Sequence, residues 1–159
     1  MTTKTLYCNM LIVDEKINRA LVLTKLRGPK FLLGKDNFPG GHIDEGETPE
    51  QGAIRETGEE ANVFVGKDAA VVLIKHTINE TTELYTYAAA VPSKDFEAFK
   101  SMTDEPLRIE AIKPYLASLA LDPDRAAPDL AELINKGVNL LTAELARRNQ
   151  SDPVMNMST

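Results

Sequence analysis

Three acidic residues, Glu56, Glu59 and Glu60, lie close together in the sequence. On an α-helix they occupy positions i, i+3 and i+4, so their carboxylates lie on one face. Like charges at this spacing cost a few tenths of a kcal/mol per pair, and Gly58 costs about 1 kcal/mol relative to alanine. These penalties favour a compensating partner. Hard carboxylate oxygens suit Mg²⁺ or Mn²⁺, which proteins usually share with substrate phosphates.

A glycine-rich turn precedes this acidic segment. Gly40 and Gly41 are followed by an isolated acid, Glu47. Glycines let the backbone approach a ligand closely, and the exposed carbonyls of such a turn can supply a metal ligand. The alternative is an ordinary acidic helix face exposed to solvent, which is what paired glutamates alone would indicate. The turn and Glu47 together favour the metal site.

The stretch from Gly41 to Val63 resembles the Nudix box, G-x5-E-x7-R-E-U-x-E-E-x-G-U, in which U is aliphatic. Thr57 stands where an aliphatic residue is usual, which would loosen packing under the helix. Asn62 replaces the closing glycine but also accepts left-handed dihedral angles. Neither change involves a candidate ligand. The positions in register are Gly41, Glu47, Arg55, Glu56, Glu59, Glu60 and Val63.

The resemblance implies a Nudix hydrolase with an α/β (α+β) fold, an α/β/α sandwich with a mixed β-sheet between helices. Such an enzyme cleaves a pyrophosphate bond in a nucleoside diphosphate linked to another group X. The cofactor implied is Mg²⁺, with Mn²⁺ as a possible substitute. By the same resemblance, the metal ligands would be Glu56, Glu59, Glu60 and a main-chain carbonyl at Gly40 or Gly41.

The resemblance also implies catalytic roles for Glu47, Arg55, Glu56 and Glu59. Arg55 would orient Glu47 or Glu56, and an ion pair with Glu59, four residues further on, is compatible with either. Bound cations would neutralise phosphate oxygens and lower the pKa of a bound water. A positioned carboxylate would then remove the water's proton.

Outside the box, residues 34–41 resemble the corresponding stretch of MutT-type enzymes, some of which hydrolyse oxidised purine nucleoside triphosphates. This resemblance implies that Asn37 reads the base, although it also fits a turn residue that caps its own backbone. Glu105 would add a metal ligand or base, and Asp129 would reach a purine edge. Both also fit ordinary turn and N-cap acids. Gly41 and His42 are the remaining candidates for contact with substrate.

The substrate expected on this basis is a nucleoside triphosphate, oxidised purines included, cleaved to the monophosphate and pyrophosphate. ADP-ribose, a nucleotide sugar or a dinucleoside polyphosphate remains an alternative, because specificity in the family is set outside the box. A Nudix scaffold that binds a nucleotide without turnover is the alternative from another class. The retained acids of the box favour the enzyme.

The elements that must position these groups alternate between strands and helices. Thr48 is predicted to cap a helix over residues 49–61, with Gln51 as its capping-box partner. Ser93 is predicted to cap a short helix that ends at Lys100, and apolar residues from Leu130 to Leu145 predict a last helix that ends near Arg147. Strands are expected over residues 5–13, 20–26, 69–77, 83–91 and 107–112.

Composition restricts the partners. The chain has 159 residues, with 18 Lys and Arg against 24 Asp and Glu, a net charge of −6. The cations are scattered, which argues against extended nucleic acid, and the sequence lacks an apolar run long enough to span a bilayer. We expect a cytoplasmic protein, monomeric or homodimeric, with a reduced Cys8 in its core and a small-molecule nucleotide as its partner. A single Nudix domain is expected over residues 1–150 and a flexible tail over 151–159.

Overall fold

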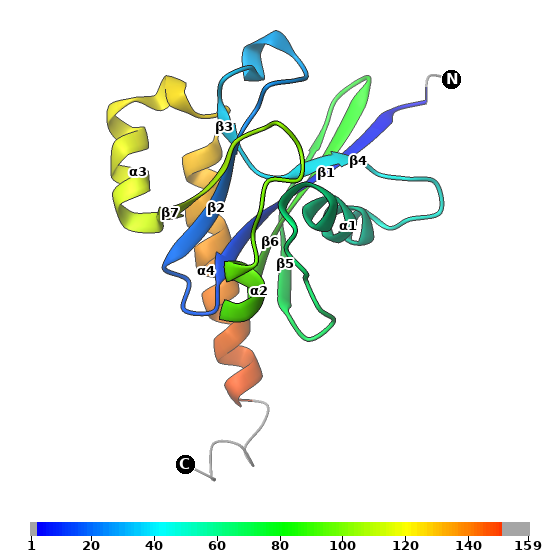
Figure 1. The fold of residues 1–159 in the computed structure, drawn as a ribbon. Helices are drawn as coiled ribbons and strands as arrows, with labels where there is room; N and C mark the ends of the chain where they lie inside the picture. The colour runs from blue at the N-terminus through cyan, green and yellow to red at the C-terminus, as the bar shows by residue number, and fades with distance from the viewer. Residues whose placement is uncertain (1–2, 151–159) are drawn as a thin grey trace.

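The structure, a computed structural model, describes residues 3–150, and in this part of the chain seven strands form one mixed sheet (Figure 1). The central strand β1 (Thr5–Asp14) pairs in parallel with β6 (Thr82–Val91), and β5 (Ala70–Ile78) pairs with the far side of β6. The other edge of β1 is shared by β2 and β4. The remaining strand bounds are β2 Arg19–Thr24, β3 Asp36–Asn37, β4 Gly40–His42 and β7 Leu107–Ala111.

Helices cover both faces of this sheet. Side chains alternate along β1, so Met10 and Ile12 pack in one apolar cluster with Ala53 of helix α1. Leu11 and Val13 point to the other face and pack in a second cluster, which contains Ile134 of α4. The predicted α/β/α arrangement with a mixed sheet is therefore confirmed. The helices are α1 Pro49–Ala61, α2 Ser93–Glu97, α3 Ile112–Leu121 and α4 Leu130–Gln150, with 3-10 turns at Lys30–Leu32 and Pro123–Arg125.

Helix α1 begins and ends where the sequence predicts. The Thr48 hydroxyl accepts a hydrogen bond from the Gln51 amide at 3.1 Å, and the Gln51 side chain accepts one from the Thr48 amide at 2.9 Å. Pro49 occupies the first turn, where its missing N–H costs nothing. Asn62 closes the helix in the left-handed conformation, with φ 58°. The substitution of Asn for the usual glycine is therefore compatible with this helix end.

Other elements differ from the prediction. Residues 25 and 26 do not continue β2, because residues 25–35 form a loop closed by backbone hydrogen bonds between Lys25 and the Gly34–Lys35 pair. Ser93 is the first residue of α2 rather than its cap, and its hydroxyl donates to Glu15. Helix α2 ends at Glu97, earlier than expected, and helix α3 was not anticipated at all. The expected tail, residues 151–159, lies outside the described residues.

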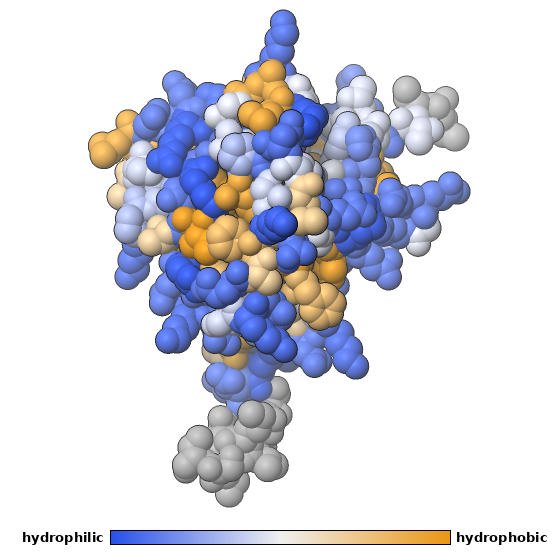
Figure 2. All heavy atoms as spheres, viewed as in Figure 1, coloured by the Kyte–Doolittle hydropathy of each residue, from blue (hydrophilic) through white to orange (hydrophobic). Residues whose placement is uncertain are grey.

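Seen from the side of Figure 1, most of the molecular surface is hydrophilic, with apolar side chains gathered towards its middle (Figure 2). Within residues 3–150, no helix combines the length and the apolar character needed to cross a bilayer. Cys8 is 1% exposed, as expected for a core residue. A single domain over residues 1–150 stays a prediction.

Candidate active site

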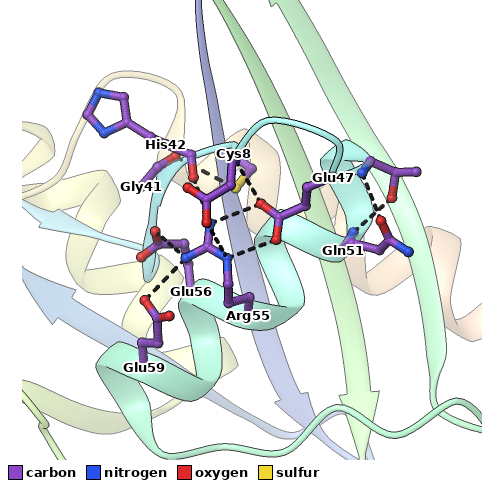
Figure 3. Close-up of polar contacts among 10 residues, drawn as sticks. Cys8, Gly41, His42, Glu47, Gln51, Arg55, Glu56 and Glu59 are labelled. Atoms are coloured by element: carbon purple, nitrogen blue, oxygen red, sulfur yellow. Dashed lines mark hydrogen bonds and ion pairs between the residues drawn. The ribbon is translucent and has the colours of Figure 1, made fainter.

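Arg55 lies at the centre of a network that joins α1 to the loop before it (Figure 3). Its guanidinium makes two hydrogen bonds to the Glu47 carboxylate, at 2.8 and 3.0 Å. The same group donates to the His42 carbonyl at 2.9 Å and forms an ion pair with Asp44 at 3.3 Å. This fork of parallel donors fixes a carboxylate in orientation as well as in position. Arg55 therefore ties the loop of residues 42–47 to the helix.

The other edge of the guanidinium contacts two glutamates of α1. Arg55 Nη1 lies 3.0 Å from Glu56 Oε1 and 3.2 Å from Glu59 Oε2. The hydrogen bond with Glu47 is the main cause that raises the pKa of Arg55 above its ordinary value, and Arg55 in turn lowers the pKa of Glu47. The partners expected for Arg55, Glu47 or Glu56 together with Glu59, are all in contact with it.

The two glycines of β4 let this strand approach its neighbours closely. A Cβ atom on Gly40 would overlap the Cys8 carbonyl oxygen of β1, and one on Gly41 would lie 2.7 Å from the Glu56 carboxylate. The absence of side chains therefore packs the strand against β1 and places Glu56 against the backbone of Gly41. Glu60 also reaches this strand, because its Oε2 accepts a hydrogen bond from the Gly40 amide at 3.1 Å.

Glu60 and Glu105 add negative charge beside Glu56. Burial raises the pKa of Glu60 to about 7, and the nearby Glu56 and Glu105 carboxylates act in the same direction. Glu105, from the loop before β7, is 3% exposed. Its Oε2 accepts hydrogen bonds from the amides of Leu26 at 2.7 Å and Arg27 at 3.3 Å, and it lies 3.6 Å from Lys25 Nζ.

The structure does not bring the three expected carboxylates to one point. Among residues 3–150, no three His, Cys, Asp or Glu side chains converge tightly enough to hold a metal ion. Glu56 and Glu59 share the Nη1 donor of Arg55, whereas Glu60 turns to the Gly40 amide. The chemistry of the site nevertheless fits a hard divalent cation. The half-buried Glu60 faces two further carboxylates, and a cation would relieve that repulsion.

The candidate substrate residues lie in different elements. Asn37 Oδ1 accepts a hydrogen bond from the Phe38 amide at 2.8 Å, so Asn37 caps its own backbone. The His42 side chain is exposed, and its ring centroid lies 4.7 Å from that of Tyr7. Asp129 directly precedes α4 with a left-handed φ of 66° and lies 3.4 Å from Lys75. These three residues do not contact one another through any of these interactions.

Sequence reasoning missed Asn9 of β1. This residue pairs with Gly40, and its Oδ1 is buried without a hydrogen-bond partner among residues 3–150. The signal in the sequence is a single amide side chain within the apolar run of residues 6–13. Thr57, the departure from the aliphatic pattern, is fully buried and its hydroxyl oxygen also lacks a partner. Loss of that hydrogen bond is the energetic consequence of a hydroxyl at this position.

Comparison with known proteins identifies the family of this arrangement. The profile described as NUDIX domain matches residues 6–135. A curated protein of Escherichia coli (strain K12), 8-oxo-dGTP diphosphatase, is 39% identical over 46 residues, which are 29% of this chain and 36% of that protein. The chain thus matches little more than a third of the length of this relative.

Solved structures show the same fold at low sequence identity. A MutT structure from a study of Aliivibrio salmonicida and Vibrio cholerae has a TM-score of 0.63 and 17% identity, over 84% of this chain and 99% of that one. A bifunctional NMN adenylyltransferase/ADP ribose pyrophosphatase of Francisella tularensis, complexed with AMP and a manganese ion, has a TM-score of 0.62 and 15% identity. That match covers 91% of this chain and 42% of the other.

Proposed function

This chain belongs to the Nudix family, and from that membership we propose that it is a Mg²⁺-dependent hydrolase that cleaves a nucleoside triphosphate to the monophosphate and pyrophosphate. The observation that carries the proposal is the network of Arg55, which holds Glu47, Glu56 and the backbone of His42 together. The name of the E. coli relative, 8-oxo-dGTP diphosphatase, supports a triphosphate, with oxidised purines included.

The proposed metal ligands are Glu56, Glu59 and Glu60, with a carbonyl oxygen of Gly40 or Gly41. Bound Mg²⁺ or Mn²⁺ neutralises phosphate oxygens and lowers the pKa of a water molecule. Glu60 is held for this role by the Gly40 amide, and Glu56 by Arg55. Because Arg55 contacts both Glu56 and Glu59, it holds these two carboxylates in place before the substrate arrives.

In this proposal Glu47 holds the loop and Arg55 in position and does not bind the metal ion. It accepts two hydrogen bonds from Arg55 and one from the Asp44 amide at 2.8 Å. These contacts set the path of the loop of residues 42–47, which leads from β4 into α1. Loss of Glu47 would release both the loop and the guanidinium, and with them the position of Glu56.

Two carboxylates are proposed to accept the proton of the attacking water. Glu105 is held rigidly by the Leu26 and Arg27 amides and lies close enough to Glu60 to influence its pKa. Glu59 is an accessible acid of the box, with 60% of its side chain exposed, and contacts Arg55. Glutamine at each position removes the base and preserves the shape. Because Glu59 is also a proposed metal ligand, the base is the position whose glutamine variant loses kcat while it keeps Mn²⁺ binding.

We propose that three further residues contact the substrate: Asn37, His42 and Asp129. The Asn37 side-chain amide still has its Nδ2 donors for a base edge, and the exposed imidazole of His42 can meet a phosphate. The Asp129 carboxylate offers acceptors for a purine edge. These residues complete a proposal in which the box holds the phosphates and flanking segments hold the nucleoside.

The decisive experiment identifies both products from a substrate panel with Mg²⁺, with Mn²⁺ and with a chelator. The panel contains ordinary and oxidised purine triphosphates, pyrimidine triphosphates, ADP-ribose, a nucleotide sugar and a dinucleoside polyphosphate. We expect metal-dependent release of pyrophosphate from triphosphates. Faster cleavage of another class would reassign the substrate, and binding without turnover would indicate a nucleotide-binding module.

The variant Glu60→Gln tests the metal role, with Glu80→Gln as its control. Glu80 is exposed in the turn between β5 and β6, away from the box. We expect Glu60→Gln to lose Mn²⁺ binding and turnover, and Glu80→Gln to keep both. Full turnover of Glu60→Gln at saturating substrate would remove this residue from the metal site.

A further inference from the structure

One buried acid has no part in the mechanism above. Asp36 of β3 is 3% exposed, although carboxylates are rarely buried without paired charges. Its Oδ2 accepts hydrogen bonds from Arg108 Nη2 and from the Tyr115 hydroxyl, both at 2.6 Å. The Nε of Arg125 lies 3.2 Å from the same oxygen. One carboxylate therefore contacts β7, α3 and the 3-10 turn Pro123–Arg125.

Glu110 of β7 closes this network. It lies 3.2 Å from the Nε of Arg108 and 3.2 Å from the Nη2 of Arg125. The two guanidinium groups also lie 5.9 and 5.3 Å from the centre of the Tyr115 ring. Two cations and two anions thus balance around one aromatic side chain. Asp36 is buried, whereas the side chains of its charged neighbours are 24 to 38% exposed. Ion pairs with this much exposure contribute little net stability, so the value of the network lies in fixing the relative positions of the elements that it joins.

The backbone around Asp36 joins the same two segments. The Asp36 carbonyl accepts a hydrogen bond from the Ala127 amide at 2.9 Å, and Asp36 forms a parallel bridge with Ala126. The Lys35 ammonium donates to the Asp124 carbonyl. Residues 35–37 and 124–127 therefore lie side by side, although they are far apart in the sequence.

Each of these segments leads directly to a candidate base-reading residue. Asn37 follows Asp36, and Asp129 stands two positions after Ala127. Asp129 is in the left-handed conformation, which aspartate tolerates better than most residues. Its backbone is held on both sides, because the Leu130 amide donates to the Ala127 carbonyl and the Leu133 amide donates to the Asp129 carbonyl. The distance between the two candidates is therefore set by the segments that the Asp36 network connects.

We propose that Asp36 is a positioning residue for nucleobase recognition, which fixes Asn37 and Asp129 at the separation that one base requires. This inference rests on the proposed function, because it concerns the nucleoside end of the same substrate. Preorganised contacts bind without the cost of ordering the residues that make them. Loosening the network therefore weakens binding of the preferred base and leaves the chemistry at the phosphates intact.

The test compares Asp36→Asn and Tyr115→Phe with a matched control, Asp14→Asn. Asp14 is also a buried aspartate that contacts an arginine, Arg19, but it is the last residue of β1 and belongs to no part of the Asp36 network. We measure kcat and KM for purine and pyrimidine triphosphates, and calorimetric binding of the corresponding monophosphates, which needs no turnover. Thermal unfolding monitors the folded fraction of each variant.

For Asp36→Asn we expect KM for the preferred base to rise about tenfold with kcat within about threefold, so discrimination between bases shrinks by a similar factor. Tyr115→Phe should reduce discrimination between bases by a smaller factor. If Asp36→Asn does not fold, Tyr115→Phe is the variant that tests the inference. Asp14→Asn should leave discrimination unchanged. A structural role alone would lower kcat equally for every base, through a smaller folded fraction.

Unchanged discrimination in the folded variants would overturn the inference, as would an equal loss in Asp14→Asn. Absence of turnover by the wild-type protein on the whole panel would refute the proposed function. The inference would still be tested in that case, because calorimetric binding of monophosphates measures base discrimination without turnover. Wild-type protein that binds no nucleotide, or binds all bases equally, would overturn the inference itself.

Discussion

Substitution of Gly41 by alanine separates the geometry of the site from the stability of the fold. The new Cβ would lie 2.7 Å from the carboxyl carbon of Glu56, whereas ordinary contacts begin near 3.4 Å. The Glu56 carboxylate must therefore move by about 0.7 Å, and it can do so because it is the end of a flexible side chain. We expect Gly41→Ala to fold with a stability change below about 1 kcal/mol.

The expected cost falls on catalysis. A misplacement of about 1 Å in a catalytic arrangement lowers the rate about 10²-fold, which corresponds to about 2.7 kcal/mol in the activation barrier. The shift worked out for Glu56 is slightly smaller, so we predict a loss in kcat of about 10- to 10²-fold. Weaker Mn²⁺ binding should accompany it, because Glu56 is a proposed ligand.

Gly40→Ala is the contrasting variant. Its Cβ would overlap the Cys8 carbonyl and come within 2.5 Å of the Asn9 Cβ, and these atoms belong to the central strand β1. The backbone cannot yield as a side chain does, so this variant should lose about 1–3 kcal/mol of stability or more.

Urea unfolding, kcat on the preferred triphosphate and Mn²⁺ calorimetry measure these effects. If Gly41→Ala keeps kcat within about threefold, the exact position of Glu56 does not matter and our reading of the site is wrong. A Gly40→Ala protein as stable as the wild type would contradict the close packing of β4 on β1.

Three further changes concern the scaffold. In urea unfolding, Gly137→Ala should be less stable than Gly58→Ala by about 1–3 kcal/mol. The new Cβ at position 137 would lie 3.2 Å from that of Ala88, whereas position 58 has room for a methyl group and alanine favours the helix there. Equal stabilities of the two variants would contradict this. Thr48→Ala should cost about 1 kcal/mol through loss of the capping box, and an unchanged midpoint would argue against it. Burial raises the pKa of Cys8 to about 11, so its alkylation should be slow at pH 8 and faster at higher pH or in urea; rapid reaction of the native protein would refute this burial.

Local signals in the sequence were sufficient to predict helix α1, whereas the network around Arg55 was implied by the resemblance to the Nudix box. Thr48, Pro49 and Asn62 each act on backbone atoms within a few residues, so the helix ends are encoded where they occur. Among the partners of Arg55, Glu59 follows from helical spacing, and Glu47 and Glu56 came from the resemblance. The alternation of apolar strands and helices indicated an α/β or α+β class, and the resemblance implied the sandwich with a mixed sheet.

Helix α3 carried weaker signals. Pro114 falls in its first turn, where proline is tolerated, but Ala111 provides no side-chain cap. Its buried residues, including Tyr115, are fixed by packing against distant strands rather than by local preference. The Asp36 network was equally invisible, because its members lie in four separate elements.

The three carboxylates of the box show another limit of sequence reasoning. Helical spacing places Glu56, Glu59 and Glu60 near one another, but the direction of each side chain depends on a donor elsewhere. Glu60 turned to the Gly40 amide because β4 passes beside the helix. The direction of the Glu60 side chain can therefore be predicted only when the position of β4 in the sheet is known.

The parallel pairing of β1 with β6 has a consequence for how the protein folds. Thr5 lies opposite Thr82 and Asp14 opposite Val91, so this pairing closes a long stretch of chain that contains β4 and the whole of α1. Closing so long a loop costs chain entropy before the contacts between the two strands can form. Contacts between residues that are distant in the sequence also slow folding. During synthesis the acids of the box leave the ribosome well before β6, the strand that pairs with β1. The active site therefore reaches its final geometry only after β6 has joined the sheet.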